Sequence, residues 1–189
     1  MNEVEMKKNQ IRKEYLQARK EIRFKEEKSK SIVQKVIANP DYQKARVVAL
    51  YRSMSSEVNT NELIRHALEN GKIVVLPRVE NEELVFYQIT SSTEKLIKSR
   101  FGVEEPEAKD NMRVSKDRID LVIVPGVCFD IEKSRMGFGK GYYDRFLKDM
   151  VAMKIGICFE EQVIKEELLP VSEYDVKMDQ LITDICIYD

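Results

Sequence analysis

The sequence has one histidine, three cysteines and no long apolar run, and each scarcity argues against a class of protein. His66 is the single histidine and lies on a stretch typical of a helix, which argues against a histidine metal centre or a catalytic triad. Any catalytic or ligand-binding group must then be a carboxylate, lysine, arginine, tyrosine, the backbone or a bound ion. Cys128, Cys158 and Cys186 are odd in number and widely spaced in apolar segments, as expected of buried free thiols in a cytoplasmic protein.

The longest apolar runs are about as long as a strand, far short of the ~20 residues that span a bilayer. The first residues lack the apolar stretch of a signal peptide. Lysine and arginine number 32 against 33 acidic residues, so no basic field predicts a nucleic acid or an anionic membrane as partner. With 189 residues, 43% of them hydrophobic, we expect one globular domain over residues 1–189, a monomer whose partners are small molecules.

Glycine is also scarce, and three of the seven glycines alternate within one segment. Residues 135–145 read Arg-Met-Gly-Phe-Gly-Lys-Gly-Tyr-Tyr-Asp-Arg, after an apolar segment (120–125) and before a helix expected from Tyr142 onward. A glycine-rich turn between strand and helix directs backbone amides at one point, which suits a phosphate. The segment matches neither Gly-x-x-x-x-Gly-Lys-Ser/Thr nor Gly-x-Gly-x-x-Gly, so on spacing alone a structural turn without ligand stays open. The cations Arg135 and Lys140 favour an anion site.

Hydrophobic periodicity predicts an α/β domain with a mostly parallel sheet. Two helices are expected over residues 3–38, broken near 24–28, and they pack as extra N-terminal helices on a core formed by residues 46–189. Strands at 46–51 and 72–76, the second ended by Pro77, enclose a helix from about residue 60 to 70 and form a βαβ unit. Further strands are expected at 84–89, 120–125, 154–159 and 181–187, further helices at 142–150 and 162–168, and an irregular surface segment at 91–118.

Several segments together resemble the 5-formyltetrahydrofolate cyclo-ligase (methenyltetrahydrofolate synthetase) family. They are Lys8-Asn-Gln-Ile-Arg12, Glu57 with Thr60, Pro77-Arg78, Pro125-Gly-Val-Cys-Phe-Asp130, the glycine-rich run to Asp144, and Leu169-Pro170 with Asp175 and Asp179. The resemblance implies that ATP and 5-formyltetrahydrofolate give 5,10-methenyltetrahydrofolate, ADP and phosphate, with Mg²⁺. It also implies a three-layer αβα fold related to sugar-phosphate isomerase and coenzyme A transferase domains.

The resemblance also implies roles for residues that the pattern alone leaves ambiguous. Without it, Lys8 and Arg12 would be a solvated basic stripe, Glu57 an exposed loop carboxylate, and the aspartates helix caps or ion-pair partners. With it, Arg52 and Glu57 contact the folate, together with Phe138, Gly139, Lys140, Gly141 and Tyr142. Lys140 and Arg135 are the expected catalytic cations, and Asp144 and Asp175 the expected magnesium ligands, with Asp179 as a weaker option. The expected ATP-binding residues are Lys8, Arg12, Arg135, Met136, Gly137, Phe138, Gly139, Lys140, Gly141, Tyr142 and Tyr143.

Two positions depart from the family pattern. Lys133 stands where a glycine is common, so the turn from Asp130 to Ser134 is open to a different shape. Tyr174 stands where a histidine is common, so the role of that position in the family is not carried over. Two other functions are kept as alternatives: a catalytically silent folate- or nucleotide-binding protein on the same fold, and a sugar-phosphate isomerase. The joint presence of phosphate cations and carboxylates argues against the first. No evident base for sugar chemistry supports the second.

Overall fold

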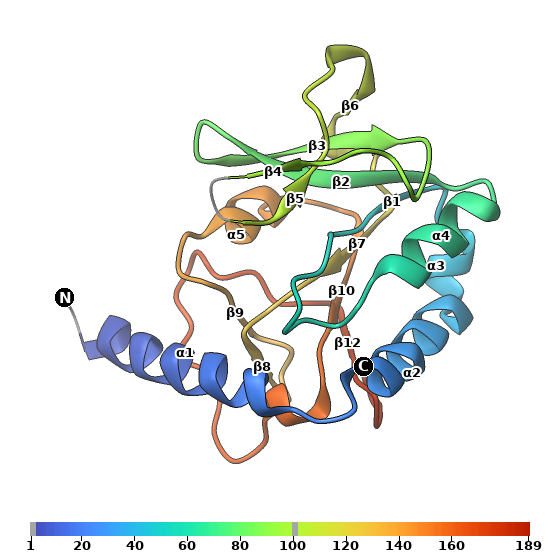
Figure 1. Ribbon diagram of the computed structural model, residues 1–189. Helices are drawn as coiled ribbons and strands as arrows, with labels where there is room; N and C mark the ends of the chain where they lie inside the picture. Colours follow the sequence, from blue (N-terminus) through green and yellow to red (C-terminus); the bar gives the residue numbers. More distant parts are fainter. Residues whose placement is uncertain (1–2, 100–101) are drawn as a thin grey trace.

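The computed structural model describes residues 3–99 and 102–189 (Figure 1). Within that range no helix is long and apolar enough to cross a membrane. The α-helices are α1 (Glu3–Glu21), α2 (Lys25–Ala38), α3 (Pro40–Lys44), α4 (Asn61–Glu69) and α5 (Tyr142–Leu147). Short 3-10 helices are η1 (Asp110–Met112), η2 (Lys116–Arg118) and η3 (Glu160–Gln162).

The strands form one large sheet, one small sheet and a hairpin. The large sheet has the order β13-β12-β10-β7-β1-β2-β3-β6, the small sheet β11-β8-β9, and the hairpin β4-β5. The strands are β1 (Val47–Ala49), β2 (Ile73–Glu80), β3 (Glu83–Ile89), β4 (Ile97–Lys98), β5 (Glu104–Glu105), β6 (Arg113–Val114), β7 (Leu121–Val124), β8 (Cys128–Asp130), β9 (Arg135–Met136), β10 (Met153–Ile157), β11 (Val163–Ile164), β12 (Gln180–Ile182) and β13 (Ile187–Tyr188).

The centre of the large sheet is parallel, as the sequence predicted. β12, β10, β7, β1 and β2 are joined by parallel pairing, and β13, β3 and β6 are antiparallel additions at the two edges. The expected βαβ unit is β1-α4-β2, with Val47 opposite Ile73. Chain order reverses between β1 and β7, because β1 leads to β2 on one side while β7 leads to β10 and β12 on the other. Such a switch point leaves a crevice at the carboxyl ends of the strands.

Alternate strand residues supply a core on each face of the sheet. Val48 of β1 and Ile123 of β7 pack with the buried faces of α2 and α4. Their neighbours Ala49 and Val122 pack on the other face, with Leu147 of α5. Helices therefore cover both faces, which gives the expected three layers.

Helix α1 does not join either of these cores. It runs past β8 and β9 of the small sheet (Figure 1). There Ile11 packs with Cys128 of β8 and Met136 of β9, and Tyr15 packs beside them. β8 and β9 of the small sheet connect β7 to the glycine-rich segment, so α1 packs on the strands that hold that segment.

The structure corrects three sequence expectations. Pro77 does not end its strand: β2 continues to Glu80, and Pro77 lies past the last β1 pair, so no neighbour on that side needs its missing N–H. The helix expected at 162–168 is absent, since Val163 and Ile164 are buried and pair with β8 instead. The last strand divides into the β12–β13 hairpin around a turn in which the Thr183 amide donates to the Cys186 carbonyl.

The expectation of three buried thiols is confirmed for Cys128 and Cys158, which are free and buried, whereas Cys186 is half-buried near the β12–β13 turn. Burial raises the pKa of the Cys128 thiol to about 12, so the group stays protonated at neutral pH and packs as a small apolar side chain.

Gly156 offers a test of the packing between the two sheets. A Cβ placed there would lie 2.7 Å from Cε1 of Phe129, 3.1 Å from Cγ of Met178 and 3.2 Å from Cδ1 of Leu181. We expect Gly156→Ala to lower the free energy of unfolding by about 2 kcal/mol, because the methyl group overpacks a buried site. Urea denaturation measures the change. Val151→Ala, at a fully exposed position, is the control and should leave stability unchanged.

Candidate active site

A cavity of about 580 Å³ opens at the switch point between β1 and β7. Its walls include Tyr51 and Arg52, which follow β1, and Pro125 and Gly126, which follow β7. The glycine-rich segment closes another side. Ligand sites of α/β proteins commonly lie at this end of the strands, and the volume is typical of a small-molecule site. The cavity brings together every residue predicted above to bind nucleotide, folate or metal except Asp179.

The glycine-rich segment begins in β9, not directly after β7 as the sequence suggested. β8 and β9 form a short antiparallel pair that turns the chain back across the small sheet. A Cβ on Gly137 would lie 2.8 Å from Nη1 of Arg135, and one on Gly139 would lie 3.1 Å from Cζ of Arg12. Gly139 also has a φ of 88°, which disfavours other residues. The two glycines are therefore needed so that two guanidinium groups can pack on the backbone.

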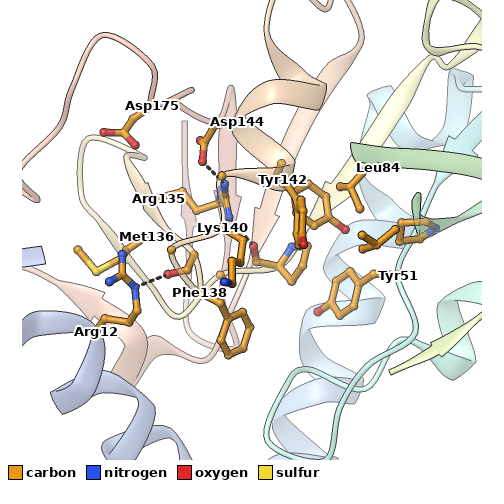
Figure 2. A pocket seen from close by; sticks show the side chains of 18 of the residues that line it. Arg12, Tyr51, Leu84, Arg135, Met136, Phe138, Lys140, Tyr142, Asp144 and Asp175 are labelled. Carbon is orange, nitrogen blue, oxygen red and sulfur yellow. Dashed lines mark hydrogen bonds and ion pairs between the residues drawn. The ribbon is translucent and has the colours of Figure 1, made fainter. Parts of the chain in front are cut away.

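Arg135 is held in the cavity wall by several contacts. Its Nη2 donates to Oδ2 of Asp144 at 3.0 Å, and its Nη1 donates to the Pro125 carbonyl at 3.4 Å (Figure 2). Its guanidinium also lies over the Tyr143 ring, 5.4 Å from the centroid. Lys140, by contrast, is exposed on the loop and lines the cavity. The site therefore holds one fixed cation and one cation on an exposed loop.

Helix α1 brings Lys8 and Arg12 to the same cavity. Nζ of Lys8 lies 2.5 Å from Oδ2 of Asp175. Nε of Arg12 donates to the Gly137 carbonyl at 2.9 Å, a bond drawn in Figure 2. Both side chains are partly buried, so the interpretation of the pair as a solvated stripe is wrong.

Glu57 lines the same cavity and is buried. Its Oε2 accepts a hydrogen bond from the Met54 amide at 2.9 Å, and its Oε1 lies 3.7 Å from Nη1 of Arg19. Burial raises the pKa of the Glu57 carboxyl, while the Met54 amide and Arg19 oppose that rise. The interpretation of Glu57 as an exposed loop carboxylate is therefore wrong. Arg52 lines the cavity nearby and donates to Oδ1 of Asn61 at 2.9 Å.

Aromatic rings also line the cavity. Figure 2 shows Phe138 and Tyr142 beside Lys140, with Tyr51 and Leu84 across the cavity. Tyr142 also lies under the Arg145 guanidinium, 5.4 Å from the centroid. Tyr143 instead packs against the core on the α5 face of the sheet. This wall is apolar and aromatic, which suits a flat heterocyclic ring.

The carboxylates predicted to bind metal are already paired with cations. Asp144 bonds Arg135 and accepts the Val176 amide at 3.2 Å. Asp175 bonds Lys8 and the Ser172 amide, and these contacts lower the pKa of its carboxyl against the effect of burial. Among the described residues no group of three or more histidine, cysteine or acidic side chains is placed to hold a metal ion. Asp179 lies outside the cavity walls and bonds Lys154 at 2.9 Å.

Lys133 lies in the tight turn that joins β8 to β9. Lys133 adopts a φ of 65°, the left-handed conformation that favours glycine. The turn is closed by hydrogen bonds from the Ser134 amide to Oδ1 of Asp130 and from the Lys133 amide to the Asp130 carbonyl. Tyr174 is exposed and is not a residue of the cavity wall.

Sequence reasoning missed several residues of the site. Tyr51, Leu84, Glu104 and Ser172 line the cavity, and Arg19 lies behind the wall in contact with Glu57. Arg19 carries a signal in hindsight, because it follows Arg12 by seven residues and therefore shares its helix face. The others lie on ordinary strands and loops, without a motif.

The fold and the site together define an α/β protein in which a glycine-rich loop with cationic side chains lines the same cavity as aromatic rings and a buried carboxylate. The comparisons with known proteins agree. The family model described as the 5-formyltetrahydrofolate cyclo-ligase family matches residues 4–184. A probable 5-formyltetrahydrofolate cyclo-ligase of Schizosaccharomyces pombe is 34% identical, over 81% of this chain and 82% of that protein. The 5-formyltetrahydrofolate cyclo-ligase of Mus musculus is 32% identical, over 80% of this chain and 79% of that protein.

A solved structure has a similar fold. The 5,10-methenyltetrahydrofolate synthetase of Aquifex aeolicus superposes with a TM-score of 0.82 at 35% identity, covering 95% of this chain and 91% of that one. This chain belongs to the 5-formyltetrahydrofolate cyclo-ligase family, and it is an enzyme of the ATP-dependent ligase class. The kinship with sugar-phosphate isomerase and coenzyme A transferase domains stays a prediction.

The pairing of Asp144 with Arg135 predicts a structural role that does not need a metal. Their side chains are 17% and 4% exposed, and removing one charge of a buried pair leaves the other uncompensated. We expect Asp144→Asn to lower the free energy of unfolding by about 3 kcal/mol in the absence of nucleotide, folate and magnesium. Urea denaturation checks this.

The matched control is Asp149→Asn, which removes the same charge just past the end of α5. Asp149 is exposed with a φ of 58°, a conformation that asparagine tolerates, so stability should not change. A wild-type unfolding curve for Asp144→Asn would contradict the structural role.

Proposed function

We propose that the residues that meet in the cavity carry out the reaction of this family, in which ATP and 5-formyltetrahydrofolate give 5,10-methenyltetrahydrofolate, ADP and phosphate. The observation that supports this best is the position of the glycine-rich loop. Arg12 of α1 bonds the Gly137 carbonyl of the loop, and the loop lines the same cavity as the buried Glu57 and the rings of Tyr51 and Tyr142. A phosphate chain and a pterin ring can therefore approach the same short segment.

On the nucleotide side, the loop and α1 supply the positive charge. Lys8 and Arg12 come from the helix, and Arg135 and Lys140 from the loop. Phosphoryl transfer requires the reacting groups to be aligned and the developing charge to be stabilised. We propose that Arg12, Arg135 and Lys140 hold the phosphates, with Lys140 nearest the transferred group because its ammonium is exposed to the cavity.

On the folate side, Glu57 is the recognition group in our proposal. A pterin carries adjacent N–H donors on one edge, and an ionised carboxylate is the acceptor that suits them. Phe138 and Tyr142 are the rings available to pack on the heterocycle. Arg52 and the main chain from Gly139 to Gly141 complete the predicted contacts.

The chemistry follows from the poor leaving ability of a formamide oxygen. The formyl oxygen attacks the γ-phosphorus of ATP, the bond from that phosphorus to the bridging oxygen breaks, and ADP leaves. The product of this step is an iminium phosphate, and N10 attacks its carbon, the former formyl carbon. The carbon–oxygen bond breaks, phosphate departs with the former formyl oxygen, and N10 loses its proton. Lys140 and Arg135 stabilise charge on the phosphoryl group through both steps.

The donor set fits a magnesium ion that is held mainly by phosphate and water. Mg²⁺ is commonly bound through one or two carboxylates plus substrate phosphates, and Asp144 and Asp175 both line the cavity. When bound, the ion would neutralise phosphate charge. We propose these two aspartates as its ligands. An arriving phosphate chain would compete for Arg135 and Lys8, the cations with which the aspartates are now paired.

We further propose that the chain acts as a single-domain monomer in the cytoplasm. The balanced charge of the sequence and its free thiols support that location. The alternative of a catalytically silent binding protein finds no support in the family match, and the assay below tests it directly.

The test is the appearance of methenyltetrahydrofolate absorbance when the protein meets 5-formyltetrahydrofolate, ATP and magnesium. We expect growth of the signal only with all three present, and equimolar ADP and phosphate. Folate binding without ATP-dependent product would instead support the silent binding protein.

Lys140→Ala tests the proposed loop cation. Because the side chain is exposed, the variant should fold normally, as thermal melting would show. We expect kcat to fall at least about 100-fold, since a charge that stabilises the transferred phosphoryl group is lost. Lys148→Ala removes an exposed lysine just after α5 and is the control with wild-type rates. A near-normal rate for Lys140→Ala would refute the proposed role.

A further inference from the structure

Helix α1 presents three cations on one face, of which the sequence identified two. Lys8, Arg12 and Arg19 are separated by four and seven residues, which are about one and two helical turns. Arg19 therefore lies roughly 10 Å further along the helix axis than Arg12. Lys8 and Arg12 contact the nucleotide side of the cavity, whereas Arg19 reaches the side where Glu57 lies.

Arg19 is buried behind the cavity wall and contacts three residues that form it. Its side chain is 3% exposed. Its Nη1 donates to the Gly126 carbonyl at 3.3 Å and lies 3.7 Å from Oε1 of Glu57. Its guanidinium lies over the Phe138 ring, 5.4 Å from the centroid. Glu57, Gly126 and Phe138 all line the cavity, but Arg19 itself does not.

The contacts of Arg19 contribute little to the stability of the fold. Nε of Arg19 is buried and has no hydrogen-bond partner among the described residues. The distance to Glu57 is too long for a hydrogen bond, so the pair gains attraction only, and Nη1 donates to the Gly126 carbonyl instead. The same geometry leaves Oε1 of Glu57 without a bond from Arg19, while Oε2 takes the Met54 amide. The Met54 amide and Arg19 therefore orient the Glu57 carboxylate, but Arg19 donates no hydrogen bond to its Oε1.

We propose that Arg19 is a positioning residue for the reduced folate: it holds Glu57 ionised and oriented, and it holds the Phe138 ring at the cavity wall. The inference rests on the proposed function and extends it to a residue outside the cavity lining. It also gives α1 a role in both halves of the site.

The charges around Glu57 determine how its binding role should depend on pH. Arg19 faces it from α1, Tyr51 from the end of β1 and Tyr143 from α5. Burial raises the pKa of both tyrosines, so they are neutral at neutral pH. The carboxylate accepts pterin N–H donors only when ionised, so folate binding weakens as pH falls through the pKa of Glu57. Without Arg19 that pKa rises, and the weakening begins at a higher pH.

The principal test compares Arg19→Met with Lys20→Met, which removes the neighbouring exposed charge from the same helix. For Arg19→Met we expect KM for 5-formyltetrahydrofolate to rise about tenfold at neutral pH, with kcat and KM for ATP nearly unchanged. The acid limb of kcat/KM for the folate should move to higher pH. Arg19→Lys keeps the charge and should restore the wild-type limb. Lys20→Met should match wild type throughout.

A double-mutant cycle distinguishes action through Glu57 from a structural effect. Glu57→Gln should raise KM for the folate and remove the acid limb, and adding Arg19→Met should raise KM little further. The double variant also avoids a buried unpaired carboxylate, so it serves if Arg19→Met does not fold.

Three results would overturn the proposal: an unchanged KM and pH profile in Arg19→Met, additive KM effects in the double variant, or an equal rise of KM for ATP. Absence of ATP-dependent product from the wild-type protein would instead refute the proposed function itself.

Discussion

The bond from Arg12 to the Gly137 carbonyl is the contact on which the arrangement of the site depends. It joins a helix near the start of the chain to a loop more than a hundred residues later. A Cβ on Gly139 would lie 3.1 Å from Cζ of Arg12, and the φ of 88° at Gly139 also disfavours other residues. With the helix docked in this way, Lys8 reaches Asp175 and Arg19 reaches Glu57. One rigid helix thus sets the positions of three cations relative to the loop.

Three cations of the site have an acidic partner, whereas Arg12 donates to the Gly137 carbonyl and to Oδ1 of Asn9. Arg135 pairs with Asp144, Lys8 with Asp175 and Arg19 with Glu57. Cations enclosed in a cavity need such partners when no anionic ligand is bound, because an unpaired buried charge is destabilising. The pairs differ in character: the first two make hydrogen bonds at 3.0 Å or less, and the third is held at 3.7 Å. That difference is why we assign Arg19 to positioning and the others to direct ligand contact.

The sequence predicted the parts of this structure that depend on local periodicity and turn chemistry. Such patterns predict the two helices within residues 3–38, the parallel strands and the start of α5 after the glycine-rich segment. What it missed depends on neighbours far along the chain. Pro77 continues a strand because β1 ends before it, and Val163 forms a strand because β8 is beside it. Likewise, the helical spacing places Arg19 on the face of Arg12, but its burial depends on the loop that carries Phe138, which is distant in the sequence.

The central claim is that ATP and the folate meet at one loop, so that phosphate passes directly to the formyl oxygen. The most direct measurement is to label that oxygen with ¹⁸O and follow it through one turnover by mass spectrometry. Our account predicts that the label appears in the released inorganic phosphate. Label released into water, with phosphate unlabelled, would contradict direct transfer and the proposed placement of the two substrates.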